Sequence, residues 1–172
     1  IWLTGLSGAG KTTLAAELQR TLSAQGVHCF VLDGDQLRQG LTRGLGFSPA
    51  DRMENIRRAA EAARLLNLAG VTVIGAFISP CRAGRAMARD IVGPAAFVEV
   101  YLNTPLAVCE ARDPKGLYAR VRAGEIAEFT GISAPYEAPE QPAVAVDTTA
   151  CTVAQASRAV MEALAAPPDF SF

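Results

Sequence analysis

The stretch Gly5-Leu6-Ser7-Gly8-Ala9-Gly10-Lys11-Thr12 matches the pattern G-x-x-x-x-G-K-[ST] at every fixed position. An apolar run at residues 1–4 precedes it and leucines at four-residue spacing follow it, so we expect a strand, a loop and a helix. Glycines in such a loop let successive N–H groups converge on phosphate oxygens, and the helix N-terminus adds its positive dipole end. A chance Gly-rich turn is the alternative interpretation. We predict that Lys11 reaches the β- and γ-phosphates of a nucleoside triphosphate and that Thr12 ligates Mg²⁺.

The composition is that of one folded domain, with 172 residues of which 50% are hydrophobic and 19% charged. Lys plus Arg number 16 against 17 Asp plus Glu, so the net charge gives no general attraction to nucleic acid or to a membrane. Four dispersed cysteines and a single histidine disfavour a zinc site and favour a cytoplasmic protein with reduced thiols. No apolar run approaches the roughly 20 residues that span a bilayer. Because residue 1 already lies in a strand pattern, we also expect a domain of a longer polypeptide.

Apolar runs alternate with helical patterns along the whole chain, which predicts an α/β fold. We expect a doubly wound parallel sheet with helices on both faces and five strands, at residues 1–4, 27–32, 71–77, 97–102 and 143–146. Helices are predicted after the phosphate loop, from Pro49, around residues 85–91, from Pro105 and over residues 153–164. Residues 112–139 are rich in Gly, Pro and charge, so we predict an irregular segment that acts as a lid.

Two polar clusters follow the second predicted strand. Asp35 is placed to hold Mg²⁺ through water or to accept a proton from an attacking hydroxyl, and Arg38 to bind an anion. The alternative is a turn in which Asp35 caps a short helix. On the next helix Arg52, Asn55 and Arg58 share a face, which predicts either a binding surface or an ordinary solvated one.

Three longer motifs occur in order along the chain: D-G-D-Q-L-R at 33–38, L-G-F-S-P-A-D-R-M-E-N at 45–55 and R-D-P-K-G-L-Y at 112–118. With the phosphate loop, this set resembles the adenylyl-sulfate kinases, P-loop kinases that use MgATP to phosphorylate the 3′-hydroxyl of adenosine 5′-phosphosulfate. The resemblance covers essentially the whole chain. It implies a kinase domain over residues 1–172 with its lid at about residues 112–139.

The resemblance also implies roles for individual residues. The catalytic residues are expected to be Lys11, Asp35 and Lys115, with Thr12 and Asp35 at the metal. The expected ATP site contains Gly5, Leu6, Ser7, Gly8, Ala9, Gly10, Lys11, Thr12, Thr13, Arg112 and Cys151. The expected acceptor site contains Asp33, Asp35, Arg38, Phe47, Arg52, Asn55, Ile78, Ser79, Lys115, Leu117 and Phe129. Within it, Phe47 and Phe129 resemble the pair that sandwiches the acceptor adenine, and Ser79 resembles a serine that is phosphorylated in some members.

Family membership further implies ATP and Mg²⁺ as cofactors, a homo-oligomer, and fusion to an ATP sulfurylase domain. Other functions share part of this pattern. A nucleoside monophosphate kinase would have the same loop, anion clamp and lid, and a fused domain that has lost catalysis would still bind nucleotide. A switch GTPase is disfavoured because the N-K-x-D element that reads guanine is missing, as no Asn-Lys pair occurs in the sequence.

Overall fold

The computed structural model describes residues 1–165. Its five strands are all parallel and lie in the order β2-β3-β1-β4-β5. They are β1 (Trp2–Thr4), β2 (Cys29–Asp33), β3 (Thr72–Ala76), β4 (Glu99–Leu102) and β5 (Val144–Val146). Each falls within or beside a predicted strand, so the predicted sheet is confirmed. Residues 166–172 of the expected 1–172 domain lie outside the described part.

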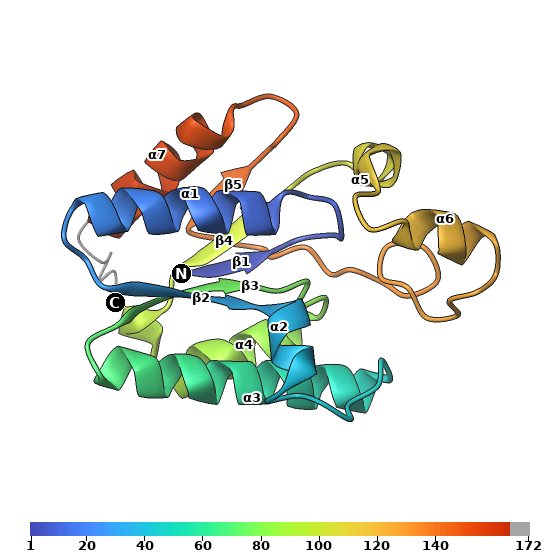
Figure 1. Ribbon diagram of the computed structural model, residues 1–172, viewed down its shortest axis with the longest axis horizontal. Helices are drawn as coiled ribbons and strands as arrows, with labels where there is room; N and C mark the ends of the chain where they lie inside the picture. The colour runs from blue at the N-terminus through green and yellow to red at the C-terminus, as the bar shows by residue number, and fades with distance from the viewer. Residues whose placement is uncertain (166–172) are drawn as a thin grey trace.

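Helices cover both faces of the sheet, as Figure 1 shows. Helices α1 (Lys11–Ala24) and α7 (Val153–Ala165) pack on one face, and α3 (Pro49–Leu68) and α4 (Arg82–Val92) on the other. The start of α3 follows the sequence closely, because Pro49 occupies its first turn and the Ser48 hydroxyl accepts a hydrogen bond from the Asp51 amide at 3.2 Å. The doubly wound α/β class is confirmed.

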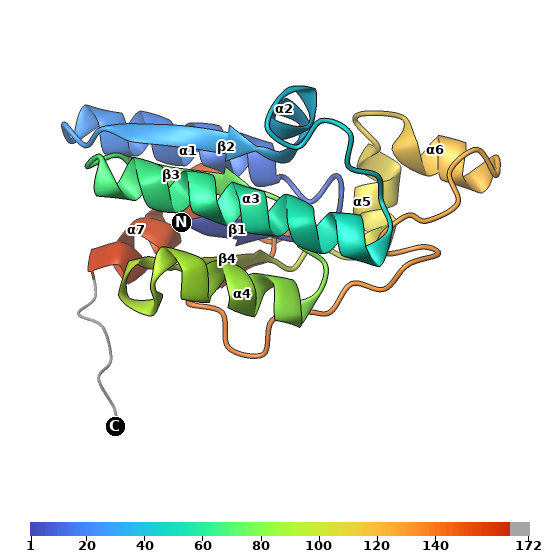
Figure 2. The ribbon, with the colours of Figure 1, turned by 90° about the horizontal axis from the view of Figure 1, so that it is seen from below.

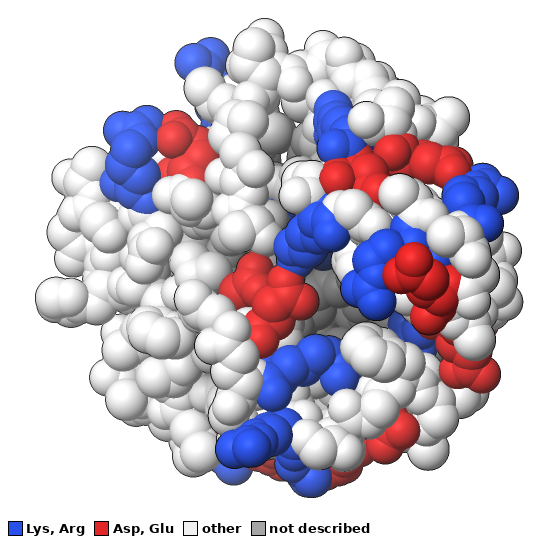
Figure 3. Space-filling view, turned by 45° about the vertical axis from the view of Figure 1, so that its right-hand side comes forward, with Lys and Arg blue, Asp and Glu red and all other residues white. Residues whose placement is uncertain are grey.

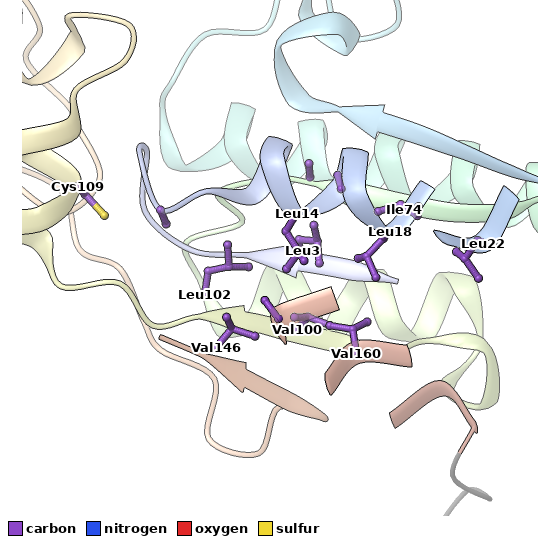
Figure 4. Close-up of a cluster of buried hydrophobic side chains, with 14 of the residues drawn as sticks. Leu3, Leu14, Leu18, Leu22, Ile74, Val100, Leu102, Cys109, Val146 and Val160 are labelled. Carbon is purple, nitrogen blue, oxygen red and sulfur yellow. The ribbon is translucent and has the colours of Figure 1, made fainter. Parts of the chain in front are cut away.

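The core consists of two clusters, one on each face of the sheet, because the side chains of the central strand β1 point alternately to the two faces. Leu3 points to the face of α1, where Leu14 and Leu18 of that helix pack with Val160 of α7 (Figure 4). Trp2 points to the opposite face and packs with residues of α3 and α4. Because successive side chains of a strand leave opposite faces, two adjacent residues anchor the two helical layers.

The remaining helices lie at the carboxyl ends of the strands (Figures 1 and 2). They are α2 (Gly34–Gln39), α5 (Leu106–Arg112) and α6 (Leu117–Arg122), and a 3₁₀ turn, η1 (Pro94–Ala96), precedes β4. Helix α6 lies inside the segment predicted to be irregular, so that part of the prediction was wrong. Its first turn is held by Asp113, whose carboxylate accepts hydrogen bonds from the amides of Tyr118 and Ala119.

Candidate active site

The phosphate loop joins β1 to α1 at the carboxyl edge of the sheet, as predicted. Gly8 has φ +77°, and a Cβ on it would lie 2.8 Å from the Cys109 carbonyl oxygen. Gly10, at φ +99°, is the residue from which α1 starts. Both positions therefore require glycine, for backbone angle at both and for space at Gly8.

Lys11 folds back into this loop. Its Nζ donates hydrogen bonds to the carbonyl oxygens of Gly5 at 2.9 Å and Leu6 at 2.7 Å. Burial lowers the pKa of Lys11 from 10.5 to about 8, and the nearby Lys115 acts in the same direction while Cys109, Asp33 and Asp35 oppose it. The amine is thus held inside the phosphate loop by two of the loop's own carbonyls.

Two carboxylates follow β2 beside the loop, and they have different tasks. Asp33 accepts hydrogen bonds from the Thr12 hydroxyl at 3.0 Å and from the Asp35 amide at 2.9 Å. Asp33 is therefore the residue that caps α2, and the alternative that assigned this cap to Asp35 is wrong. The Asp35 carboxylate instead forms an ion pair with Lys115 of the segment between α5 and α6.

The donor set here suits Mg²⁺. The Thr12 hydroxyl and the two aspartates carry hard oxygen atoms that could ligate this ion, and within residues 1–165 no group of three or more His, Cys, Asp or Glu residues forms a closed metal cage. Protein-bound Mg²⁺ commonly uses one or two carboxylates together with substrate phosphates and waters.

Basic and aromatic side chains line the opposite side of the cleft. The guanidinium carbon of Arg38 lies 4.3 Å from the centre of the Phe47 ring, and that of Arg52 lies 5.9 Å from it. Arg52 also donates hydrogen bonds to the Phe47 carbonyl at 2.7 Å, the Glu128 carbonyl at 2.8 Å and the Thr130 hydroxyl at 2.6 Å. This one side chain therefore joins the Phe47 loop to the residues on both sides of Phe129, through the Glu128 carbonyl and the Thr130 hydroxyl.

The two predicted stacking rings differ in exposure. Phe47 is 58% exposed, with the Arg38 guanidinium over its ring, whereas Phe129 is 8% exposed. Phe129 packs edge-on against Tyr118 with ring centres 4.9 Å apart, and the Tyr118 hydroxyl donates to the Ser7 carbonyl at 2.9 Å. Tyr118 thus connects the phosphate loop to the segment that carries Phe129.

The helix face that α3 presents to the cleft is only partly as predicted. Asn55 is buried and lines the cleft, and its Oδ1 has no hydrogen-bond partner in the described part of the chain. Arg58 instead pairs with Glu54 at 2.8 Å and donates to the Leu41 carbonyl at 3.1 Å, away from the cleft. The Asn55 amide oxygen is therefore available to a polar group that enters the cleft.

The loop between β3 and α4 supplies Ile78 and Ser79. Ser79 is 2% exposed, has φ +38°, and accepts a hydrogen bond from the Trp2 indole N–H at 3.2 Å.

At the other end of the cleft, Arg112 donates to the Thr148 hydroxyl at 2.8 Å and carbonyl at 3.1 Å. The sequence predicted the turn containing Cys151 as part of the site but not Thr148. The only feature that could have indicated Thr148 is its position just after the last strand.

All these groups surround a continuous cavity of about 1620 Å³ at the carboxyl edge of the sheet. Figure 3 shows this face hollowed, with basic and acidic side chains both around the opening. Every predicted site residue lines the cavity except Gly5, Leu6 and Ala9. Leu6 and Ala9 pack into the core, and Gly5 contributes its carbonyl to Lys11.

A family model described as adenylylsulphate kinase matches residues 1–147. The chain belongs to this family. An adenylyl-sulfate kinase from Aeromonas hydrophila is 58% identical over 144 residues, which cover 84% of this chain and 73% of that protein. The resemblance inferred from the sequence motifs is therefore confirmed.

Solved structures of adenylylsulphate kinases match the fold as well. The Mycobacterium tuberculosis APS kinase in complex with AMPPNP and APS has a TM-score of 0.92 and 46% identity, covering 96% of each chain. A hexameric APS kinase from Thiobacillus denitrificans has a TM-score of 0.70 and 32% identity, over 95% of this chain and 28% of that one.

Proposed function

We propose that this chain transfers the γ-phosphoryl group of ATP to the 3′-hydroxyl of adenosine 5′-phosphosulfate, giving ADP and 3′-phosphoadenosine 5′-phosphosulfate. The observation that carries the proposal is the continuous cavity, with a phosphate loop on one side and an arginine–aromatic wall on the other. Such a cavity holds two nucleotides with their reacting ends between Lys11 and Asp35. The family relative that binds AMPPNP and APS together supports the same assignment.

On the ATP side, residues 5–13 cradle the phosphates. Lys11 leaves the Gly5 and Leu6 carbonyls to neutralise charge on the transferring phosphoryl. Arg112 and the Cys151 turn form the pocket for the ATP base, and Thr148 orients that arginine. Mg²⁺, when bound with ATP, screens the β- and γ-phosphates, and Thr12, Asp33 and Asp35 are the residues that would hold it.

On the acceptor side, Phe47 and Phe129 hold the adenine and Arg38 and Arg52 read the phosphosulfate, because a guanidinium forms bidentate bonds with such anions. Asn55, Ile78, Ser79 and Leu117 complete the wall. Asp35 orients the 3′-hydroxyl and accepts its proton as the bond to phosphorus forms. Once Lys115 leaves Asp35, its ammonium group stabilises the negative charge that develops on the phosphoryl oxygens.

The proposal extends to the organisation of the protein. Residues 1–172 form the kinase domain, and residues 112–139 form a lid that closes over both nucleotides and excludes water. The hexameric relative supports a homo-oligomer, and fusion to an ATP sulfurylase and a cytoplasmic location remain parts of the proposal. No helix in residues 1–165 is long and apolar enough to span a bilayer.

A coupled assay that follows ADP formation tests this function, with adenosine 5′-phosphosulfate, AMP or no acceptor in separate reactions. We expect ADP to form only with adenosine 5′-phosphosulfate. Equal or faster turnover with AMP would identify a nucleoside monophosphate kinase. ADP formation that no acceptor stimulates would leave a nucleotide-binding domain without the transferase activity.

A further inference from the structure

Arg85, in the first turn of α4, is a buried cation outside the cavity. It is 3% exposed, although arginine is almost never fully buried unless its charge is paired. Its Nη1 donates to the Ser79 carbonyl at 2.8 Å and its Nη2 to the Glu137 carbonyl at 2.7 Å. Its Nε lies 2.7 Å from a carboxylate oxygen of Glu99 on β4. One guanidinium therefore ties together three segments that are distant in sequence.

The first of these segments forms a wall of the acceptor site. Ser79 adopts φ +38°, a region that residues with a Cβ rarely occupy. Such a conformation persists only where the surroundings hold it, and here the Ser79 carbonyl is held by Arg85 while the Thr4 hydroxyl donates to the preceding carbonyl, that of Ile78, at 2.8 Å. The position of Ile78 and Ser79 in the cavity thus depends on groups that lie behind it.

The second segment is the point where the lid returns to the sheet. Glu137 is held here by two hydrogen bonds: its carbonyl accepts from Arg85, and its amide donates to the Pro80 carbonyl at 2.8 Å. The adjacent Tyr136 shares a hydrogen bond with the Thr4 hydroxyl at 2.8 Å, and its ring centre lies 5.8 Å from the Arg85 guanidinium carbon. The end of the lid and the acceptor wall are therefore fastened to each other through the same buried cation.

We propose that Arg85 is a positioning residue for the acceptor site. It fixes the Ser79 carbonyl and the lid-return segment, residues 136–137, in one arrangement, and it acts through them because it does not itself line the cavity. The inference rests on the proposed function, since it assigns the wall beside Ser79 to the acceptor and not to ATP. A purely structural role would instead affect folding alone.

Three variants separate these roles: Arg85→Lys, Arg85→Met and Glu99→Gln. Lysine keeps the charge and the stem but lacks the planar fork that reaches both carbonyls. We expect Arg85→Lys to raise KM for adenosine 5′-phosphosulfate roughly tenfold, the loss expected for one charge-assisted hydrogen bond, and Arg85→Met to raise it further. KM for ATP should stay within about twofold of wild type in both, since no Arg85 contact reaches the ATP side.

Glu99→Gln is the matched control. It removes the charge that pairs with Arg85 but leaves both carbonyl contacts in place, so it should lower the thermal unfolding temperature without changing either KM. Acceptor KM unchanged in Arg85→Lys, or both KM values rising together, would overturn the inference.

If neither Arg85 variant folds, Tyr136→Phe provides the test. It loosens the lid-return segment without unpairing a charge, so acceptor KM should rise, and an unchanged value would contradict the inference. Wild-type protein is assayed alongside with and without adenosine 5′-phosphosulfate. Wild-type ADP formation that ignores this acceptor would refute the proposed function, whereas an active wild type with unaltered variants refutes only the role of Arg85.

Discussion

Lys115, between α5 and α6, forms an ion pair with Asp35 of α2, which is 80 positions away in the chain, and both residues line the cavity. Their side chains are 51% and 64% exposed, and ion pairs of this exposure contribute little to stability. We therefore expect substrates to displace this pair when they bind. We expect both residues then to contact the transferring phosphoryl group and the acceptor hydroxyl.

Replacing Lys115 with Gln should lower kcat by roughly 10²-fold, the scale of losing one electrostatic contact in a transition state. KM for ATP should change little, because the phosphate loop and Arg112 still bind that nucleotide. Arg122→Gln is the control, since Arg122 lies on the same lid but pairs with Glu110 and does not line the cavity. A kcat for Lys115→Gln within about threefold of the control would show that Lys115 serves only as a latch.

Asp35→Asn should lower kcat by roughly 10²-fold, the general-base scale, with ATP binding retained. The domain should keep its unfolding temperature because the cap of α2 comes from Asp33. Steady-state kinetics and thermal unfolding on the same preparation check both parts. Loss of folded protein with unchanged kcat per folded molecule would assign Asp35 a structural role instead.

Phe47→Ala should raise KM for adenosine 5′-phosphosulfate by roughly 5- to 150-fold, because base–aromatic stacking is worth about 1–3 kcal/mol per base. KM for ATP should barely change. Leu41→Ala provides the control, since Leu41 is also exposed and apolar but does not line the cavity. A rise in KM for ATP instead would mean that the two nucleotide pockets have been assigned the wrong way round.

The pH dependence should follow the lowered pKa of Lys11, about 8 in the empty protein. Above that pH the folded protein loses the ammonium that attracts phosphate, so kcat/KM for ATP should fall between about pH 8 and 10. The bound triphosphate favours the charged amine, so kcat at saturating ATP should fall only at higher pH. The coincidence of the two profiles would contradict this account.

Lys11 should also affect stability, and here its contribution rises with pH whereas kcat/KM for ATP falls. Between the folded pKa of about 8 and the ordinary value of 10.5, the unfolded chain binds more protons than the folded one. The contribution of Lys11 to the free energy of unfolding should therefore rise with pH in that window. Denaturant unfolding of Lys11→Met beside wild type isolates this contribution.

The parts of the fold that short-range patterns encode were predictable. The phosphate loop, the apolar strands and the Pro49 start of α3 depend on residues adjacent in sequence. Helix α6 was missed because its six residues lie in a stretch rich in Gly, Pro and charge and are stabilised by the Asp113 cap. The order of the strands in the sheet determines which loops meet at the site, but no local sequence pattern reveals that order.

In the site, the residues of the motifs were predictable and their supports were not. Phe129 packs against Tyr118 of α6, and Arg85 contacts Glu137, which is 52 positions away in the chain. Such contacts follow from the packing of whole elements, which sequence spacing does not specify. The cap of α2 is a local contact, in which the Asp33 carboxylate accepts a hydrogen bond from the Asp35 amide, and the sequence offered two aspartates for it.

Tracing the label from [γ-³²P]ATP tests the central claim most directly. Purified protein is incubated with Mg²⁺, labelled ATP and adenosine 5′-phosphosulfate, and the product is treated with a phosphatase specific for 3′-phosphates. We expect the label to appear in a nucleotide that retains its sulfate and to be released entirely by that phosphatase. Label that appears only as inorganic phosphate, or in a 5′-phosphate chain that the phosphatase does not attack, would contradict the proposed transfer.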